Sequence, residues 1–140
     1  MPIVINDLNG GLGNIILGIG KITEEEFLQV FTEHLTQDPE KFKKYRFSLI
    51  DWTAALRSDI STEAIKKTAE ECLRASRVNP NIVVAEVADD NFIYGMIRMS
   101  QSLRSDGNWE NEAFRSRVQA EAWIRQRVLA KFGIKAITFE

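Results

Sequence analysis

Two apolar segments without polar alternation predict strands in the middle of a sheet. Phe47–Trp52 mixes aromatic and aliphatic residues too densely for a strand with one face in water, and Ile82–Val87 is almost uniformly apolar. Strands buried on both faces are typical of α/β proteins, because helices cover both sides of their sheets. Before them, the β-prone segment Ile3–Ile5, the turn residues 9–11 and the apolar segment Asn14–Ile19 predict a hairpin.

Helical patterns alternate with these strands, and each begins at a side chain that can cap a helix. Thr23 opens a capping box for the first helix, which we expect to end near Asp38. The Ser61 hydroxyl can accept from the free N–H groups of the second helix, and Asp89 or Asp90 can do the same for the third. The chain therefore reads as alternating strands and helices after an initial hairpin.

The last helix carries more apolar surface than one sheet can cover. It follows a predicted edge strand at Trp109–Phe114, begins at Ser116 and ends at Gly133. Beside its main apolar face lies a second one, made by Val118, Ala122 and Leu129. The apolar C-terminal tail, residues 134–140, could fold back on this second face or contact another subunit in a homodimer.

Length and charge limit the classes of partner. The 140 residues suit one domain spanning 1–140. With 18 Lys and Arg against 20 Asp and Glu, the chain has no basic excess, so we do not expect nucleic acid as its main partner. No apolar run is long enough to span a membrane, and residues 1–3 are not followed by a signal-peptide pattern, so we expect a cytoplasmic protein.

The residues that usually carry chemistry are few. The glycine-rich segment Gly10–Lys21 has the wrong spacing for a phosphate-binding loop, and we interpret it as a bulged or closely packed strand. His34 has no ligand-type neighbours, and Cys72 falls on the inward stripe of the second helix. No pair of carboxylates has a spacing suited to acid and base roles. We therefore predict no catalytic residue, no cofactor, no metal site and no enzymatic activity.

The order hairpin, helix, strand, helix, strand, helix, strand, helix over residues 3–130 resembles the STAS domain. It is most similar to the SpoIIAA-like branch of that family, which consists of small stand-alone bacterial proteins. Residues 20–23 (Gly-Lys-Ile-Thr) resemble that branch's start of helix one, and residues 48–51 (Ser-Leu-Ile-Asp) its central strand. Phe114 with Ala120, Trp123 and Ile124 resembles its closing motif. The resemblance implies an α/β fold with a mixed sheet of about five strands and four helices.

The resemblance also implies a modification site. Anti-sigma factor antagonists of this family are phosphorylated on a serine in an Asp-Ser/Thr-Ser-Gly motif at the start of the second helix. That motif begins about eight residues after a polar residue that ends the strand. Asp51 and Asp59 are eight apart here, which places Ser61 over the modified serine. Ile60 and Thr62 stand where the family motif has a hydroxyl residue and a glycine. The same serine is also fully explained as an N-cap.

Two functional hypotheses follow. The first is a non-enzymatic bacterial regulatory protein that binds a protein partner, such as a kinase or an anti-sigma factor, and is switched at Ser61. Its partner surface would comprise Asp51, Trp52, Thr53, Asp59, Ser61 and Thr62. The second is a carrier or sensor of a small apolar, lipid-like ligand, because the branch is also similar to the lipid-binding SEC14 fold. A closed core would remove the second hypothesis, and a lipid-sized pocket would favour it.

Overall fold

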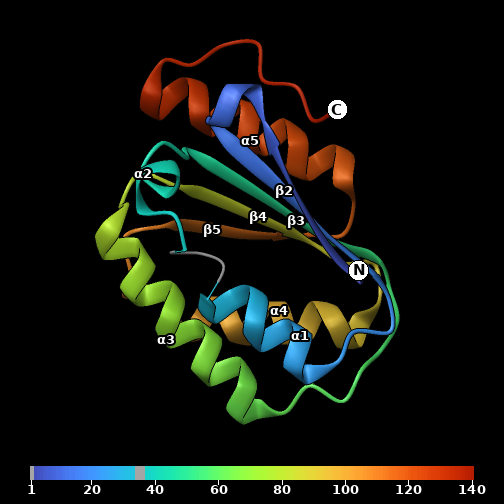
Figure 1. Cartoon of the computed structure of the whole chain (residues 1–140). Coiled ribbons are helices and arrows are strands. Elements are labelled where there is room, and N and C mark those ends of the chain that lie inside the picture. Colours follow the sequence, from blue (N-terminus) through green and yellow to red (C-terminus); the bar gives the residue numbers. More distant parts are fainter. Residues whose placement is uncertain (1, 34–36) are drawn as a thin grey trace.

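The computed structural model describes residues 2–33 and 37–140, which form one five-stranded sheet with helices on both faces (Figure 1). The strands lie in the order in which they follow one another along the chain. Their bounds are β1 Ile3–Leu8, β2 Gly13–Gly20, β3 Phe47–Ala55, β4 Val83–Val87 and β5 Glu110–Phe114. β1 pairs antiparallel with β2, and all later neighbours are parallel. The predicted α/β fold with a mixed sheet is confirmed.

The connections decide which face each helix covers. α1 (Glu24–Leu28), α3 (Thr62–Val78) and α4 (Asn91–Leu103) follow β2, β3 and β4, and each leads to the next parallel strand. Right-handed crossovers that always step in the same direction place all their helices on the same face. α5 (Arg117–Phe132) follows the edge strand and covers the opposite face, as Figure 1 shows.

The region after α1 differs from the prediction of one helix running to Asp38. α1 continues as a π-helix at Gln29–Glu33, and a separate one-turn helix, α2, spans Pro39–Phe42. Asp38 caps α2 by accepting from the Lys41 N–H at 3.2 Å, and Pro39 occupies the first position, where its missing N–H costs nothing. The prediction for His34 falls outside the described residues.

Two glycines in β2 let large side chains of β3 lie flat against the strand. A Cβ at Gly13 would come within 2.3 Å of the Phe47 ring, and one at Gly18 within 2.2 Å of the Trp52 ring. The pairing of β2 with β3 also shifts between Leu17 and Ile19. The interpretation as a bulged, closely packed strand is confirmed.

The C-terminal tail folds back on the same chain. Ile137 and Phe139 are buried on the α5 face, where the Phe139 ring lies 5.6 Å from that of Phe47. The Asn9 side chain holds Thr138 through hydrogen bonds of 2.9 and 3.1 Å. The tail leaves the second apolar face of α5 uncovered, since Val118 is 78% exposed.

Candidate functional site

Ser61 begins α3 after the central strand, as the sequence predicts. Its hydroxyl accepts a hydrogen bond from the Ala64 N–H at 3.1 Å, and its side chain is exposed. This bond satisfies one of the N–H groups that the first turn of a helix leaves without a partner. The predicted N-cap is confirmed, and the hydroxyl is open to solvent.

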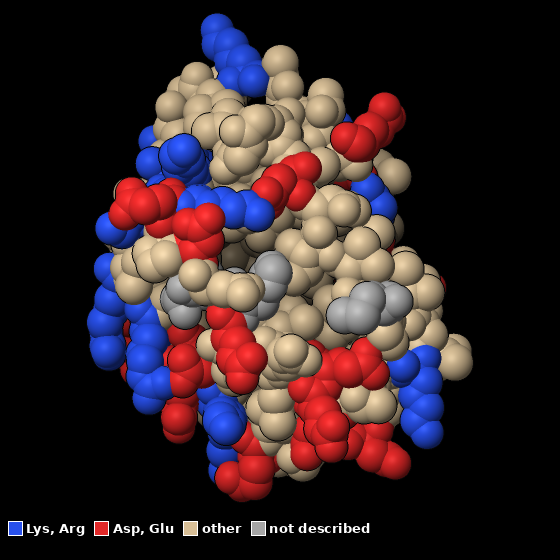
Figure 2. Space-filling model, viewed as in Figure 1, with Lys and Arg blue, Asp and Glu red and all other residues tan. Residues whose placement is uncertain are grey.

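Glu24 of α1 binds the same serine. Its carboxylate accepts a hydrogen bond from the Ser61 backbone N–H at 2.8 Å. The pKa of Glu24 is lowered, first by hydrogen bonding with the Ser61 hydroxyl and then by this backbone bond. Figure 2 shows acidic side chains gathered over the surface where α1 and α3 begin, and Glu25, Glu26 and Glu63 belong to those first turns. A phosphate on Ser61 would therefore lie next to a carboxylate.

Two residues of the predicted partner surface are not on the surface. Asp51 is 6% exposed and Trp52 is 8% exposed, and consecutive strand residues point to opposite faces of the sheet. Asp51 lies on the α5 side, where it accepts bonds from the Thr53 N–H at 2.9 Å and the Thr53 hydroxyl at 2.7 Å. Trp52 packs on the other face. This corrects the prediction that both residues are exposed with Thr53, Asp59, Ser61 and Thr62.

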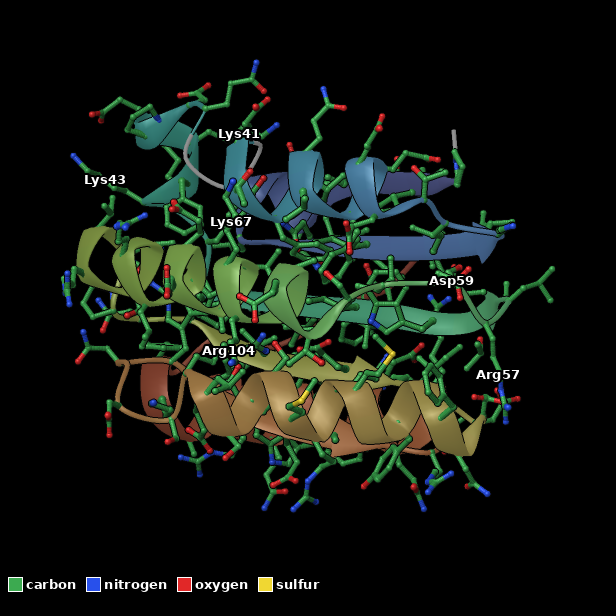
Figure 3. All side chains as sticks on the ribbon, turned by 90° about the horizontal axis from the view of Figure 1, so that it is seen from below. Lys41, Lys43, Arg57, Asp59, Lys67 and Arg104 are labelled. Atoms are coloured by element: carbon green, nitrogen blue, oxygen red, sulfur yellow. The ribbon has the colours of Figure 1, made fainter. Side chains whose placement is uncertain are left out.

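Exposed apolar side chains surround this end of the sheet instead. Ile19 is 48% exposed, Leu56 is 63% exposed and Phe92 is 49% exposed. Backbone contacts place Ile19 near Leu56: Ile19 pairs with Ala54, and the Leu56 N–H donates to the Gly20 carbonyl. Phe92 is near the residue after Leu56, since the Arg57 guanidinium lies 5.5 Å from the centre of its ring. Figure 3 shows Arg57 and Asp59 at this same end of the molecule. We call Ile19, Leu56 and Phe92 the apolar rim.

A cavity of about 80 Å³ lies between α1, α3, α4 and the sheet. Leu56, Ser58 and Ile60 line its exposed end. Its walls are mostly apolar and include Phe27, Phe31, Trp52, Ile65, Ile93, Met96 and Ile97. The cavity is larger than the space of about 30 Å³ that one water occupies, and much smaller than the roughly 300–1,000 Å³ of ordinary ligand pockets. The described part of the chain therefore has neither the closed core that would remove the second hypothesis nor the lipid-sized pocket that would favour it.

A buried ion pair closes the inner end of the cavity. Glu86 on β4 and Arg104 at the end of α4 are 5% and 7% exposed, and they are joined by a charged hydrogen bond. Arg104 also donates to Ser100 at 3.0 Å and to Asn111 at 3.0 and 3.1 Å. The Trp52 indole donates to Glu86 at 3.4 Å. Figure 3 shows Arg104 between α3 and α4, on the inner side of both helices.

Burial and charge act in opposite directions on this group of side chains. Burial by itself lowers the pKa of Arg104, but the adjacent Glu86 carboxylate outweighs it, so the pKa is raised and the guanidinium stays charged. Burial also raises the pKa of the Cys72 thiol, which lines the cavity beside this pair. The prediction that Cys72 points inward is confirmed, and its thiol stays protonated at neutral pH.

The ion pair was not predicted from the sequence. Phe92 and Leu103 of α4 have helical spacing with its buried residues, but they are 49% and 41% exposed. The inward stripe runs instead through Ile97, Ser100 and Arg104. One signal was available: Glu86 is the single charged residue in the apolar segment Ile82–Val87. A charge in a strand buried on both faces needs a partner.

Within residues 2–33 and 37–140, no group of three or more His, Cys, Asp or Glu side chains could hold a metal ion. In the same part of the chain, none of the helices combines the length and the apolar character needed to cross a bilayer.

Comparison with known proteins identifies the fold. No protein-family model and no curated protein matches the chain. A crystal structure of an uncharacterised protein of the DUF3478 family with a SpoIIAA-like fold, from Shewanella loihica PV-4, superposes with a TM-score of 0.54. The alignment covers 87% of this chain and 91% of that one at 18% sequence identity. Together with the strand order and the placement of its helices, this match shows that the chain has a SpoIIAA-like α/β fold.

Proposed function

We propose that the chain is a non-enzymatic regulatory module that binds a protein partner through the carboxyl end of its sheet. The observation that supports this most is the apolar rim: three large apolar side chains, each about half exposed or more, follow or end β2, β3 and β4 at the carboxyl end of the sheet. Exposed apolar groups with a polar surround are typical of protein interaction sites. Thr53, Asp59, Ser61 and Thr62 are exposed at the same end and complete the surface.

The charge around the rim indicates the kind of partner. Glu24 and its neighbours Glu25 and Glu26 form the first turn of α1, and Asp59 is exposed just before α3. Arg57 is paired with Asp90 at 3.0 Å, and Glu63 with Lys66 at 3.8 Å. An acidic surround favours a partner with apolar residues at the centre of its interface and basic residues at the edge. Such complementarity raises the association rate and makes it sensitive to salt.

Ser61 is the proposed switch of this surface. Phosphorylation would add about two negative charges to a hydroxyl whose own N–H is bound to Glu24. The helix start tolerates the added charge, but the neighbouring carboxylate repels it and would leave the Ser61 N–H. Because that bond ties the segment before α3 to α1, modification would alter the docking surface without unfolding the core.

Affinity capture with matched variants tests the proposal. Leu56→Ser removes the most exposed rim residue, and Leu103→Ser removes a similar exposed leucine, 41% exposed, at the other end of α4. We expect Leu56→Ser to reduce recovery of a specific partner at least tenfold and Leu103→Ser to leave it unchanged. Ser61→Asp should also reduce it while the melting temperature stays near that of the wild type. Equal recovery with all three variants would contradict the proposed surface.

A further inference from the structure

The cavity between α1, α3 and α4 has the size of a compact ligand. Its volume of about 80 Å³ is more than twice the space of one water and about half of the 150 Å³ cavity that accommodates benzene in an engineered protein. Its outer end is reachable from solvent through Leu56, Ser58 and Ile60. The cavity therefore has room for a molecule of about four or five heavy atoms.

The inner end of the cavity offers hydrogen-bond acceptors more than donors. Arg104 directs its N–H groups at Glu86, Ser100 and Asn111, and it also hydrogen-bonds the Cys72 sulfur. Glu86 differs: one carboxylate oxygen accepts from Arg104, and the other accepts the Trp52 indole N–H at 3.4 Å, beyond the usual range of about 2.7–3.2 Å. A carboxylate has about four lone-pair directions, so this oxygen can accept a further and better bond.

Protein stability does not explain why the charged pair Glu86 and Arg104 is buried beside the cavity. Taking two charged groups out of water costs more than their attraction usually returns, and apolar residues of the same volume would do as well or better. Because Glu86 and Arg104 neutralise each other, a ligand with a full charge would be attracted by one and repelled by the other. A neutral group that donates a hydrogen bond fits this arrangement best.

We infer that this cavity binds a small neutral molecule with an apolar body and one hydroxyl group, which donates to the second carboxylate oxygen of Glu86. A short-chain alcohol is the simplest member of the class. Its hydrocarbon chain lies between the aromatic rings of Phe27, Phe31 and Trp52 and the aliphatic side chains of α4. This goes beyond the proposed docking function and does not depend on it.

The indole N–H resonance of Trp52 in an amide NMR spectrum is a direct reporter, because that N–H points at Glu86. The probes are butan-1-ol and its isomer methyl propyl ether, which has the same atoms but no hydroxyl donor. We expect butan-1-ol to shift the Trp52 resonance saturably, with half-saturation on the order of 1 mM, and the ether to bind at least tenfold more weakly. Trp109 is the internal control, since its indole donates to the Asn79 carbonyl at 2.7 Å.

Two variants separate recognition from folding. Glu86→Gln alone leaves Arg104 without its counter-charge and can fail to fold, so the pair is replaced together by Glu86→Leu and Arg104→Met. This double variant should fold and lose the difference between alcohol and ether. Met96→Ala shortens a side chain that lines the cavity. The larger cavity should shift the binding preference from butan-1-ol to a longer alcohol. Absence of a saturable Trp52 shift, equal affinity for alcohol and ether, or an unaltered preference in the double variant would each overturn the inference.

Discussion

The two faces of the sheet are filled in different ways. On the α5 face, Phe47, Leu49, Val83 and Val87 are fully buried, and the C-terminal tail adds Ile137 and Phe139 to the same hydrocarbon core. On the face covered by α1, α3 and α4, the same strands carry Trp52 and Glu86 beside a cavity of about 80 Å³ and a buried ion pair. The α5 face is thus a close-packed hydrocarbon core, whereas the opposite face contains a cavity and a buried ion pair.

The connections explain why the difference falls this way. Three crossovers step in the same direction along the sheet and therefore place α1, α3 and α4 on one face. The opposite face is covered by one long helix and a tail that no crossover constrains. Since protein interiors are normally close-packed, the retained space and the buried charge set this face apart from the face covered by α5.

The largest predicted effect is the loss of packing on the α5 face. Phe47→Ala removes a fully buried ring that lies over Gly13 and against Phe139, so it should lower the free energy of unfolding by about 4–5 kcal/mol. Met96→Ala, on the wall of the existing cavity, should cost only about 1–2 kcal/mol. Urea denaturation of both variants measures the difference. Similar costs would show that the two faces are equally well packed.

The second prediction concerns the ion pair. Arg104→Met leaves the Glu86 carboxylate buried without its partner and should lower the free energy of unfolding by about 3–4 kcal/mol. Combining it with Glu86→Leu should restore most of that loss, because no uncompensated charge remains. A double-mutant cycle from urea denaturation gives the coupling. If the double variant is as unstable as Arg104→Met alone, the pair supports folding and the contrast between the faces is weaker.

The fold could be predicted from the sequence because its signals are local. The capping residues Thr23, Ser61, Asp90 and Ser116 and the αL glycine Gly133 mark helix ends through hydrogen bonds that span a few residues, and all of them function as expected. The apolar segments gave β3 and β4 for the same reason. The π-helix at Gln29–Glu33 and the one-turn α2 were missed, since short irregular helices depend on tertiary contacts more than on their own pattern.

The site was harder to predict because it is made by contacts distant in sequence. Asp51 and Trp52 are neighbours in the chain and were placed on one surface, but the strand separates them onto opposite faces. Glu86 and Arg104 are 18 residues apart and meet only because α4 packs on β4. Glu24 reaches Ser61 across 37 residues. Helix periodicity and capping patterns carry no information about such pairings.

A smaller effect on stability is expected for substitutions of Ser61, the N-cap of α3. Ser61→Ala removes the N-cap of α3 and should lower the free energy of unfolding by about 1 kcal/mol. Ser61→Asp keeps a capping oxygen but faces the Glu24 carboxylate, so it should lie within about 0.5 kcal/mol of the wild type. Thermal and urea denaturation provide the measurement. Ser116→Ala, which removes the equivalent cap of α5, is the control on the other face.

The smallest predicted effect is a pH dependence carried by Glu24. Its pKa is lowered in the folded protein, chiefly by hydrogen bonding with the Ser61 hydroxyl, so the stability it contributes is present above the unfolded value of about 4.3 and is lost as the pH falls through the lower folded value. Glu24→Gln should therefore be less stable than the wild type at pH 7, and urea denaturation should show this difference shrinking as the pH falls through the folded pKa.

Glu110 supplies the matched comparison on the α5 face. Burial raises its pKa, but Arg127 and Lys131 of α5 outweigh burial and lower it, so Glu110→Gln should show the same direction of pH dependence. The two positions differ in what else they hold: only Glu24 binds the Ser61 N–H, which ties the segment that lines the cavity mouth to α1. Glutamine keeps an acceptor oxygen, so Glu24→Ala is the variant that frees this N–H. Faster amide hydrogen exchange at residues 56–61 in Glu24→Ala, but not in Glu110→Ala, is the expected result. Equal exchange in both variants would mean that the Glu24 hydrogen bond does not hold the segment before α3 against α1.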